Sequence, residues 1–434
     1  MTLKSVWQSF AILSVGMCLP PLAGYAQVQS ATNAGSAPAL KDVFENHFRV
    51  GSAINRSIVT GQASRRSSKE VQADTALVIK HFNHLVAEND MKWQMIHPRP
   101  GEDGYDFSAA DALVSFAEEN GMELAGHTLV WHSQTPNWVF EGTHMPEPEQ
   151  GGQDERGGSS NEGDRTEDRS RGGPPRGGFG EGRGFPRSRG FVLSGPRATR
   201  EELLERMREH INTVVGRYKG RVKVWDVVNE AISDGGNEVL RRSPWSVIIG
   251  PDFVAKAFEY AHEADPDAIL RYNDYGLENA DKRGKLIKLI KGLQEQNVPV
   301  MAIGSQAHCN VTMTFETMDA ALTEMATLGL PIHITELDVN SAIGGQRGFG
   351  ADVAANAATT QGGLVEDAEA RLADAYAGIF RAFVKHRESL DIVTFWGPND
   401  ANSWRSRGRP LLFDGSSQPK PAFFAVVQTV DPAR

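Results

Sequence analysis

Short apolar runs alternate with longer amphipathic stretches over most of the chain. The short runs predict strands, and the apolar residues at helical spacing between them predict helices. The predicted helices include Glu201 to Tyr218 and Lys282 to Gln296. The predicted strands begin near Phe48, His84, Leu124, Val222, Ile269, Ala302, Ile332 and Ile392. Strands that alternate with helices form a parallel sheet, and eight such units predict an α/β fold that closes into a (β/α)8 TIM barrel.

An open, doubly wound sheet is the alternative architecture for this alternation. Dinucleotide-binding proteins of that class carry a glycine-rich loop directly after an early strand. The sequence has no such loop after its first predicted strands. The closed barrel is therefore the favoured fold.

One segment interrupts the alternation of strands and helices. Between Glu141 and Arg197 the chain is rich in Gly, Arg, Asp and Glu and has almost no aliphatic residues. Such a composition buries too little apolar surface to offset the entropy of ordering, so it predicts a disordered insert at about 141–197, in the loop after the third strand. A second flexible loop is predicted from Ala342 to Gly363, also on the strand-to-helix side.

The start of the chain predicts export. A short basic stretch precedes a mostly apolar run from Val6 to Leu22, and small residues lead up to Ala26. This pattern predicts a signal peptide at 1–26 and a flexible segment at 27–41, which leaves 42–434 for the barrel domain. The apolar run is shorter than the roughly 20 residues of a spanning helix, so we expect no stable membrane insertion. The expected location is extracellular or periplasmic.

Composition and charge exclude further classes of protein. The formal net charge of −10 argues against nucleic acid as the main partner, although the insert contains Arg-Gly-Gly repeats of a kind that can bind RNA. Of the two cysteines, Cys18 lies in the predicted signal and only Cys309 remains after processing, which leaves no internal disulfide. We expect a monomer whose stability comes from packing.

Polar and aromatic residues gather where the predicted strands end. A barrel brings all these strand ends to one face, so the side chains are expected to converge. Each of them alone would be read as a strand-end hydrogen bond or a helix cap. Together, carboxylates, amides and tryptophans in one cleft indicate sugar recognition, because aromatic faces cover sugar C–H groups and polar groups pair with hydroxyls. The set comprises Glu88, Asn89, His127, Trp131, Asn229, Glu230, Asn273, Asp274, Tyr275, Gln306, His308, Glu336, Asp338 and Trp396.

Two carboxylates in this set have the positions that glycoside hydrolysis requires. Glu230 ends the fourth predicted strand and Glu336 ends the seventh. Hydrolysis with retention of configuration needs an acid that protonates the leaving oxygen and a nucleophilic carboxylate about 5 to 5.5 Å away. The sequence places both residues on one barrel rim.

Seven motifs in order along the chain resemble those of the xylanases of glycoside hydrolase family 10. The resemblance covers nearly all of Asp42 to Val430 apart from the two loops. It implies a retaining endo-β-1,4-xylanase that acts on xylan or xylo-oligosaccharides, with Glu230 as acid/base and Glu336 as nucleophile. The motifs are AENDMKW (Ala87 to Trp93), GHTLVWHSQ (Gly126 to Gln134), WDVVNE (Trp225 to Glu230), NDYG (Asn273 to Gly276), GSQAH (Gly304 to His308), TELD (Thr335 to Asp338), and SWR with PLLFDG (Ser403 to Arg405 and Pro410 to Gly415).

The same resemblance implies roles for the residues around the two glutamates. Asn229 is expected to bind the sugar 2-hydroxyl, and His308 with Asp338 to orient the nucleophile. Tyr275 and Gln306 are expected near the cut and on the leaving-group side. On the non-reducing side, the expected hydroxyl-binding residues are Glu88, Asn89, Lys92, His127 and Gln134, and the expected aromatic walls are Trp131, Trp396 and Trp404. Pro398 and Asn399 depart from the commonest wording of the family, so the rim beside Trp404 is expected to differ in shape.

Several residues that attract attention are predicted to be structural. Trp93 and Trp225 are expected in the core, and Cys309 as a packed thiol rather than a nucleophile. His127 and His132 suggest a metal pair, but no further ligands with metal-like spacing follow, so we expect no metal and no cofactor.

Two rival functions remain at this point. Another β-1,4-glycanase, a cellulase or mixed-linkage glucanase, would use the same carboxylates, but Glu88, Lys92 and Trp404 as the family arranges them would crowd the hydroxymethyl group that xylose lacks. A non-catalytic glycan-binding barrel is disfavoured because Glu230 and Glu336 are both present.

Overall fold

The computed structural model describes residues 37–144, 195–341 and 365–430. The chain divides into two units, Met1–Pro38 and Ala39–Arg434, and the second unit contains the barrel. The predicted signal peptide, most of the 27–41 segment and the whole of the second loop lie outside the described residues, as does the middle of the insert.

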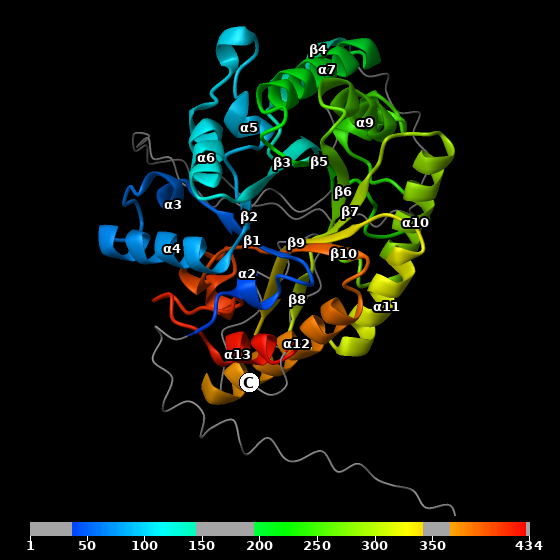
Figure 1. Cartoon of the computed structure of the whole chain (residues 1–434). Helices are drawn as coiled ribbons and strands as arrows, with labels where there is room; N and C mark the ends of the chain where they lie inside the picture. Colours follow the sequence, from blue (N-terminus) through cyan, green and yellow to red (C-terminus); the bar gives the residue numbers. More distant parts are fainter. Residues whose placement is uncertain (1–36, 145–194, 342–364, 431–434) are drawn as a thin grey trace, which may run out of the picture. The chain divides into compact units, whose positions relative to one another are not determined.

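Eight parallel strands close into a barrel, as the sequence predicts (Figure 1). The strands follow one another around the barrel in chain order, and the last pairs with the first through the register of Arg49 with Ile392. Each begins within two residues of its predicted start, and the open sheet is excluded. They are β1 (Arg49–Ile54), β2 (His84–Ala87), β3 (Glu123–Trp131), β5 (Val224–Asn229), β6 (Ile269–Asp274), β7 (Ala302–Ser305), β9 (Ile332–Asn340) and β10 (Leu390–Phe395).

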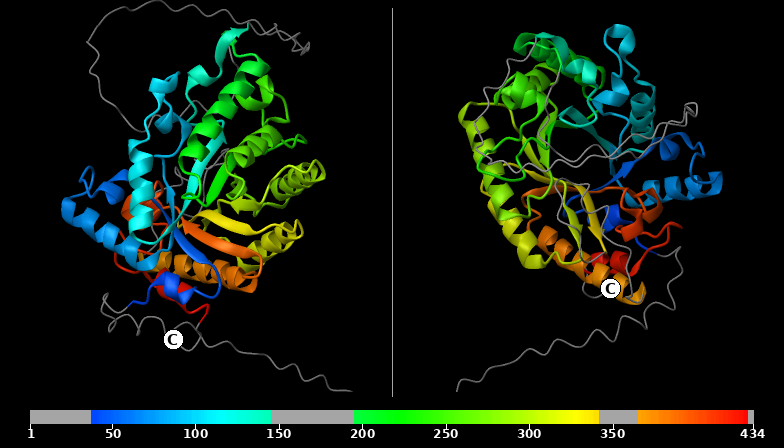
Figure 2. Two further views of the ribbon diagram at one scale, coloured as in Figure 1. Left: turned by 45° about the horizontal axis from the view of Figure 1, so that its top comes forward. Right: turned by 180° about the vertical axis from the view of Figure 1, so that it is seen from behind.

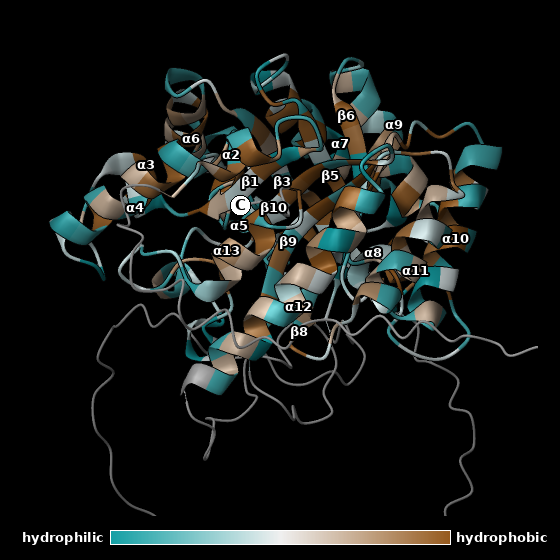
Figure 3. Ribbon diagram, turned by 60° about the horizontal axis from the view of Figure 1, so that its bottom comes forward, coloured by the Kyte–Doolittle hydropathy of each residue, from teal (hydrophilic) through white to brown (hydrophobic). Residues whose placement is uncertain are grey.

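Helices surround the barrel (Figures 1 and 2). The apolar faces of these helices pack on the strands, and hydrophobic colouring gathers on the strands in Figure 3. The side chain of Thr199 accepts a hydrogen bond from the backbone of Glu202 in a capping box. This cap explains why the helix predicted from Glu201 begins at Arg200. The longer helices are α4 (Ser68–His81), α6 (Ser108–Glu119), α7 (Arg200–Arg217), α9 (Phe253–Ala264), α10 (Ala280–Glu295), α11 (Phe315–Ala326), α12 (Val365–Lys385) and α13 (Pro421–Val427). The shorter ones are α2 (Leu40–Val43), α3 (Arg56–Thr60), α5 (Trp93–Ile96) and α8 (Pro244–Ile248).

Two short strands were not predicted. β8 (His308–Asn310) pairs with β9 at the rim and brings His308 into register with Asp338. β4 (Glu141–His144) lies at the start of the predicted insert, and Glu141 forms an antiparallel bridge with Arg197 at its end. The predicted bounds of 141–197 are therefore too wide, because both ends are ordered and meet each other.

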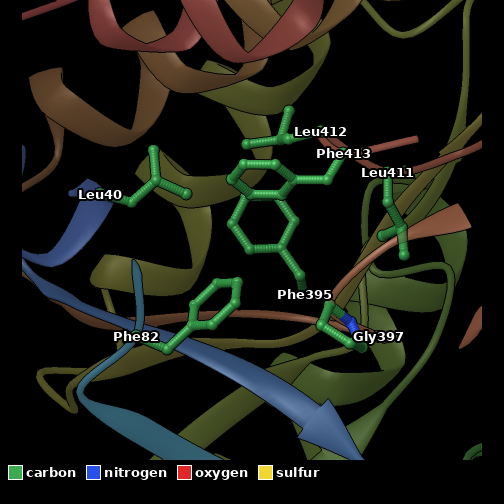
Figure 4. Close-up of a pocket in the computed structure, with 8 residues that line it drawn as sticks. Leu40, Phe82, Phe395, Gly397, Leu411, Leu412 and Phe413 are labelled. Atoms are coloured by element: carbon green, nitrogen blue, oxygen red, sulfur yellow. The ribbon is translucent and has the colours of Figure 1, made fainter. Parts of the chain in front are cut away.

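The segment that follows the Trp404 loop is anchored by apolar packing (Figure 4). Leu411, Leu412 and Phe413 pack against Phe82 of the α4–β2 connection and Phe395 of β10 around a small apolar space. The space is too narrow for a water molecule, and its lining residues are apolar. This cluster is part of the hydrophobic core and holds the rim segment in place.

Candidate active site

Glu230 lies directly after β5 and is almost fully buried, with 8% of its surface exposed. Its Oε2 accepts a hydrogen bond from Trp131 Nε1 at 3.0 Å, and its Oε1 accepts one from Gln306 Nε2 at 3.1 Å. Its backbone has a φ of 56°, in the left-handed region that is unfavourable for a side chain of this size. Strain of this kind persists where the surroundings enforce it, which is common at active sites.

Glu336 of β9 is held by two side chains, Asn273 of β6 and His308 of β8. Its Oε1 accepts from Asn273 Nδ2 at 3.0 Å, and its Oε2 lies 3.1 Å from His308 Nε2. Asn273 also donates to Asn229 Oδ1 at 2.9 Å, and that same oxygen accepts from Gln306 at 3.3 Å. A continuous chain of hydrogen bonds therefore connects Glu336 to Glu230, and the two predicted catalytic carboxylates share one site.

His308 lies between two carboxylates. Its Nε2 faces Glu336, and its Nδ1 is 3.1 Å from Asp338 Oδ2. Burial alone would lower the pKa of His308, but the charge of Asp338 and the hydrogen bonds to Asp338 and Glu336 raise that pKa to about 9. His308 is thus an imidazolium at neutral pH, and its charge lies between the two carboxyl groups and orients that of Glu336.

Asp338 has further partners on the rim segment after β10. Trp404 Nε1 donates to its Oδ2 at 2.8 Å, and Arg405 Nη1 donates to its Oδ1 at 2.7 Å. Burial would raise the pKa of Asp338, but the charges of His308 and Arg405 keep that pKa below its ordinary value. Trp404, predicted as an aromatic wall, therefore also belongs to the hydrogen-bond network that reaches Glu336 through Asp338 and His308.

A cation lies in the part of the cleft predicted to bind the non-reducing side. Lys92 donates to Asn89 Oδ1 at 3.0 Å and to Gln134 Oε1 at 2.8 Å, and its Nζ is 5.1 Å from the centre of the Trp131 ring. Only 6% of Lys92 is exposed. Burial lowers the pKa of Lys92, and the negative charges of Glu336, Glu88 and Glu230 partly offset this effect. Burial also raises the pKa of Glu88. Lys92 is therefore a buried polar group of the site rather than a solvated charge.

Two tryptophans and a histidine line the centre of the cleft. The ring of Trp396 packs edge-on to His127 at 5.5 Å and to His308 at 6.4 Å between centroids. Trp404 packs edge-on to His308 at 5.1 Å. His127 binds Asp226 Oδ2 through its Nδ1 at 2.9 Å. The structure thus brings Trp396 and Trp404 to His308, the partner of Glu336, and places His127 against Trp396.

Tyr275 is held by residues that the sequence did not single out. Its hydroxyl donates to Asp234 Oδ1 at 2.5 Å and accepts from Arg241 Nη2 at 3.0 Å. Lys282 Nζ lies 3.3 Å from the centre of the ring, and it also pairs with Asp274 at 2.9 Å. Burial raises the pKa of Tyr275, so its hydroxyl stays protonated. Tyr275 lies in the loop before α10, so neither helical spacing nor any motif in the sequence pointed to Lys282 or Arg241.

The residues predicted to be structural are buried. Trp225 and Trp93 are almost inaccessible, and Trp93 stacks on His210 with centroids 3.6 Å apart. Cys309 is a buried free thiol whose pKa is raised by burial, which disfavours the reactive thiolate.

The histidines that suggested a metal pair have other partners. His127 binds Asp226, and His132 Nε2 lies 3.4 Å from Arg241 Nη1. Among the described residues, no group of three or more His, Cys, Asp or Glu side chains is arranged to hold a metal ion.

The segment after β10 that contains Pro398 and Asn399 is anchored by the buried carboxylate of Asp74. Asn399 is fully buried and donates to Asp74 Oδ1 of α4 at 2.7 Å. Asn402 donates to Asp74 Oδ2 at 2.9 Å. Arg66 pairs with the same carboxylate at 2.7 Å. Asp74, which the sequence did not reveal as a partner, thereby fixes the segment that carries Trp404.

The sequence of the domain matches one family of glycoside hydrolases over almost its whole length. The model of glycosyl hydrolase family 10 matches residues 39–151 and 190–429. The chain belongs to glycosyl hydrolase family 10. The resemblance seen in the seven motifs is confirmed.

Characterised relatives cover most of the chain. An endo-1,4-beta-xylanase of Geobacillus stearothermophilus is 38% identical over 400 residues, which are 90% of this chain and 98% of that protein. A beta-1,4-xylanase of Dictyoglomus thermophilum is 36% identical over 399 residues, or 90% of this chain and 91% of that protein.

Solved structures show the same barrel. A family 10 endoxylanase from a sugarcane soil metagenome superimposes with a TM-score of 0.70 at 32% identity and covers 91% of this chain and 99% of that one. A variant of the intracellular xylanase of Thermoanaerobacterium saccharolyticum, in complex with xylotetraose, gives a TM-score of 0.68 at 32% identity, covering 90% and 98%. The predicted TIM barrel is confirmed. No helix within the described ranges combines the length and apolar character needed to cross a membrane.

Proposed function

We propose that Glu230 and Glu336 are the acid/base and the nucleophile with which this family 10 endo-1,4-β-xylanase cleaves internal β-1,4-xylosidic bonds. The supporting observation is the hydrogen-bond chain from Glu336 through Asn273, Asn229 and Gln306 to Glu230, which holds two carboxyl groups at one buried site. Family membership and the xylanase relatives support the reaction, which proceeds with retention of configuration.

In the first step, Glu336 Oε attacks the anomeric carbon while Glu230 gives its proton to the leaving glycosidic oxygen. A glycosyl–enzyme ester forms, the C–O bond to the leaving chain breaks, and that chain departs with the proton. In the second step, Glu230, now a carboxylate, takes a proton from water as the water attacks the anomeric carbon. Glu336 leaves, and the two displacements restore the original configuration.

The neighbours of the pair hold charge and geometry for these steps. The His308 imidazolium, supported by Asp338, keeps Glu336 oriented before the attack and after its release. Asn273 fixes the other oxygen of Glu336. Asn229 is the group assigned to the sugar 2-hydroxyl, whose hydrogen bonds strengthen in the oxocarbenium-like transition state.

We assign xylan and xylo-oligosaccharides as substrates and divide the cleft into two sides. Glu88, Asn89, Lys92, Gln134 and His127 bind hydroxyls on the non-reducing side, where Trp131, Trp396 and Trp404 form the walls. Tyr275 and Gln306 lie on the leaving-group side. Lys92 is buried and held by Asn89 and Gln134, which supports a fixed polar wall that would crowd the hydroxymethyl group of a glucan.

The test is release of reducing ends from soluble xylan and from carboxymethylcellulose by the wild type, Glu230→Ala, Glu336→Gln and the surface control Glu388→Gln. Glu388 is 88% exposed in its side chain and lies far along the chain from any motif. We expect xylan cleavage by the wild type and the control. Loss of acid catalysis lowers the rate by about 10²- to 10⁴-fold, or about 3 to 5 kcal/mol of barrier.

A second substrate separates the two glutamates. An aryl xylobioside with an acidic phenol needs little protonation of its leaving group, so Glu230→Ala should form the glycosyl–enzyme and accumulate it, whereas Glu336→Gln should release no phenol. Xylan cleavage that survives Glu336→Gln would overturn the assignment of the nucleophile.

We further propose that the protein acts as an exported monomer. The basic and apolar start of the sequence supports export, although one of the similar solved structures is named an intracellular xylanase. Fractionation of the native host with N-terminal sequencing of the mature chain tests export, and light scattering tests the monomer. A cytosolic chain that keeps its first 26 residues would contradict the first proposal, and a dimer mass the second.

A further inference from the structure

A charged pair lies inside the barrel, away from the groups assigned to catalysis. Arg271 of β6 donates from Nε to Asp226 Oδ1 at 2.7 Å and from Nη2 to Asp226 Oδ2 at 3.0 Å. Its third nitrogen, Nη1, lies 3.0 Å from His333 Nδ1. Arg271 and Asp226 are 2% and 1% exposed, so both charges are removed from water. The bidentate geometry fixes the plane of the Asp226 carboxylate.

The same carboxylate holds His127. Asp226 Oδ2 accepts from both Arg271 Nη2 and His127 Nδ1, the latter at 2.9 Å. Burial alone would raise the pKa of Asp226, but Arg271 and His127 keep that pKa well below its ordinary value. Asp226 is therefore ionised and can only accept hydrogen bonds, so the proton in its contact with His127 resides on Nδ1.

The other neighbours of Arg271 do not balance its charge. Burial lowers the pKa values of His333 and His84, and the positive charge of Arg271 lowers them further. Both histidines are neutral, so Asp226 is the counter-charge of Arg271. Arg271 and Asp226 therefore neutralise each other. On the cleft side, Asp226 binds His127, whose ring packs against Trp396.

His127 has one ring nitrogen left for a ligand. With the proton on Nδ1, the Nε2 of a neutral ring is an acceptor, and it has no hydrogen-bond partner among the described residues. A sugar hydroxyl can donate to such a nitrogen. If the proton moved to Nε2, the ring would present a donor to the same hydroxyl instead.

We propose that Arg271 is a positioning residue that acts through Asp226 to hold His127 in the Nδ1–H tautomer, so that its Nε2 accepts a hydrogen bond from a xylose hydroxyl on the non-reducing side of the cut. This inference rests on the proposed function for the identity of the ligand, but the tautomer itself is a property of the unliganded protein. Arg271 does not contact the substrate.

The first experiment measures the tautomer directly. The ring nitrogens of His127 are observed by ¹⁵N NMR in the wild type, in Arg271→Met and in the matched control Arg283→Met. Arg283 is also a buried arginine, but it binds Glu324 and loop carbonyls. We expect a single Nδ1–H signal pattern in the wild type and in the control. In Arg271→Met we expect a mixed or inverted pattern, because the buried Asp226 without its counter-charge takes up a proton and can then donate to Nδ1, which leaves the ring proton on Nε2.

The second experiment measures catalysis on xylohexaose. We expect kcat/KM of Arg271→Met to fall by about 10- to 100-fold, the size of one or two lost hydrogen bonds, while that of Arg283→Met stays within about twofold. Arg271→Lys keeps the positive charge but loses the bidentate hydrogen bonds to Asp226, so its kcat/KM should lie between those of Arg271→Met and the wild type.

A third variant covers a failure of Arg271→Met to fold. Replacing both partners, as Asp226→Leu with Arg271→Met, removes the two charges together, which buried pairs generally tolerate better than loss of one partner. A folded variant of either kind that keeps the wild-type tautomer and kcat/KM overturns the proposal. If the wild type itself cleaves no xylan while the tautomer responds as expected, the proposed function fails and the positioning role stands.

Discussion

Trp404 donates its indole N–H to Asp338 at 2.8 Å, so an aromatic residue of the cleft is also a hydrogen-bond donor behind the nucleophile. The substitution Trp404→Phe keeps an aromatic wall and removes only this donor. We expect kcat to fall about tenfold and KM to change little, because a hydrogen bond to a charged group contributes about 1.5 to 3 kcal/mol and Arg405 still holds Asp338. Steady-state kinetics on xylohexaose measures both constants. A raised KM with unchanged kcat would show that Trp404 acts as a wall alone.

The charge on His308 makes the folded protein sensitive to alkali. The pKa of His308 is about 9 in the folded state and about 6.5 when unfolded, so the folded state binds the proton more tightly. This contribution, on the order of 3 kcal/mol, is fully present below pH 6.5 and is lost as the pH rises through about 9. Thermal unfolding of the wild type between pH 6 and 10 should show this fall, and His308→Gln should flatten it. An equally steep profile in His308→Gln would exclude His308 as the cause.

His84, inside the barrel, has the opposite effect. Burial and then Arg271 lower its pKa to about 3. Between about pH 6.5 and 3, His84 takes up a proton in the unfolded chain but not in the folded protein. The free energy of unfolding therefore falls as the pH falls. His84→Gln should reduce the slope of unfolding free energy by up to about 1.4 kcal/mol per pH unit in this window. Urea titrations at a series of pH values measure that slope, and an unchanged slope contradicts the assignment.

Gly126 permits close contact between two strands of the barrel. A methyl group at this position would lie 2.2 Å from ring carbons of Trp225, which is fully buried. Gly126→Ala should therefore destabilise the protein by several kcal/mol and lower its soluble yield. Gly284 in α10 is the matched control, since nothing lies near its added methyl group. Gly284→Ala should raise the unfolding free energy by about 0.5 to 1 kcal/mol, as measured by denaturant unfolding.

The fold was predictable because its signals are local. Each barrel strand is a short apolar run between turn residues, and this pattern located all eight within two residues. β8 has only three residues, of which His308 and Asn310 are polar, so it lacked such a pattern. β4 lies at the edge of a polar segment and was assigned to the predicted insert for the same reason.

The members of the site were easier to predict than their contacts. Strand ends and motifs located Glu230 and Glu336, but spacing along a chain does not show that Asn273 and Gln306 share an oxygen of Asn229. Partners distant in sequence, such as Arg405 for Asp338, become evident only after folding. The sequence also did not show that the Arg271 side chain points into the barrel, because an arginine in a strand can face either side. Long-range pairing of polar side chains was therefore the missing information.

Because Glu141 and Arg197 form a β-bridge, the length of the loop between them need not affect the barrel. The two ordered ends meet, so the framework has the same shape whatever number of residues connects them. Doubling a flexible connection adds only about 0.6 kcal/mol of closure entropy. We therefore expect that natural variation and protein engineering can exchange this segment, and that a graft placed between these two residues leaves the eight strands, Glu230 and Glu336 in place.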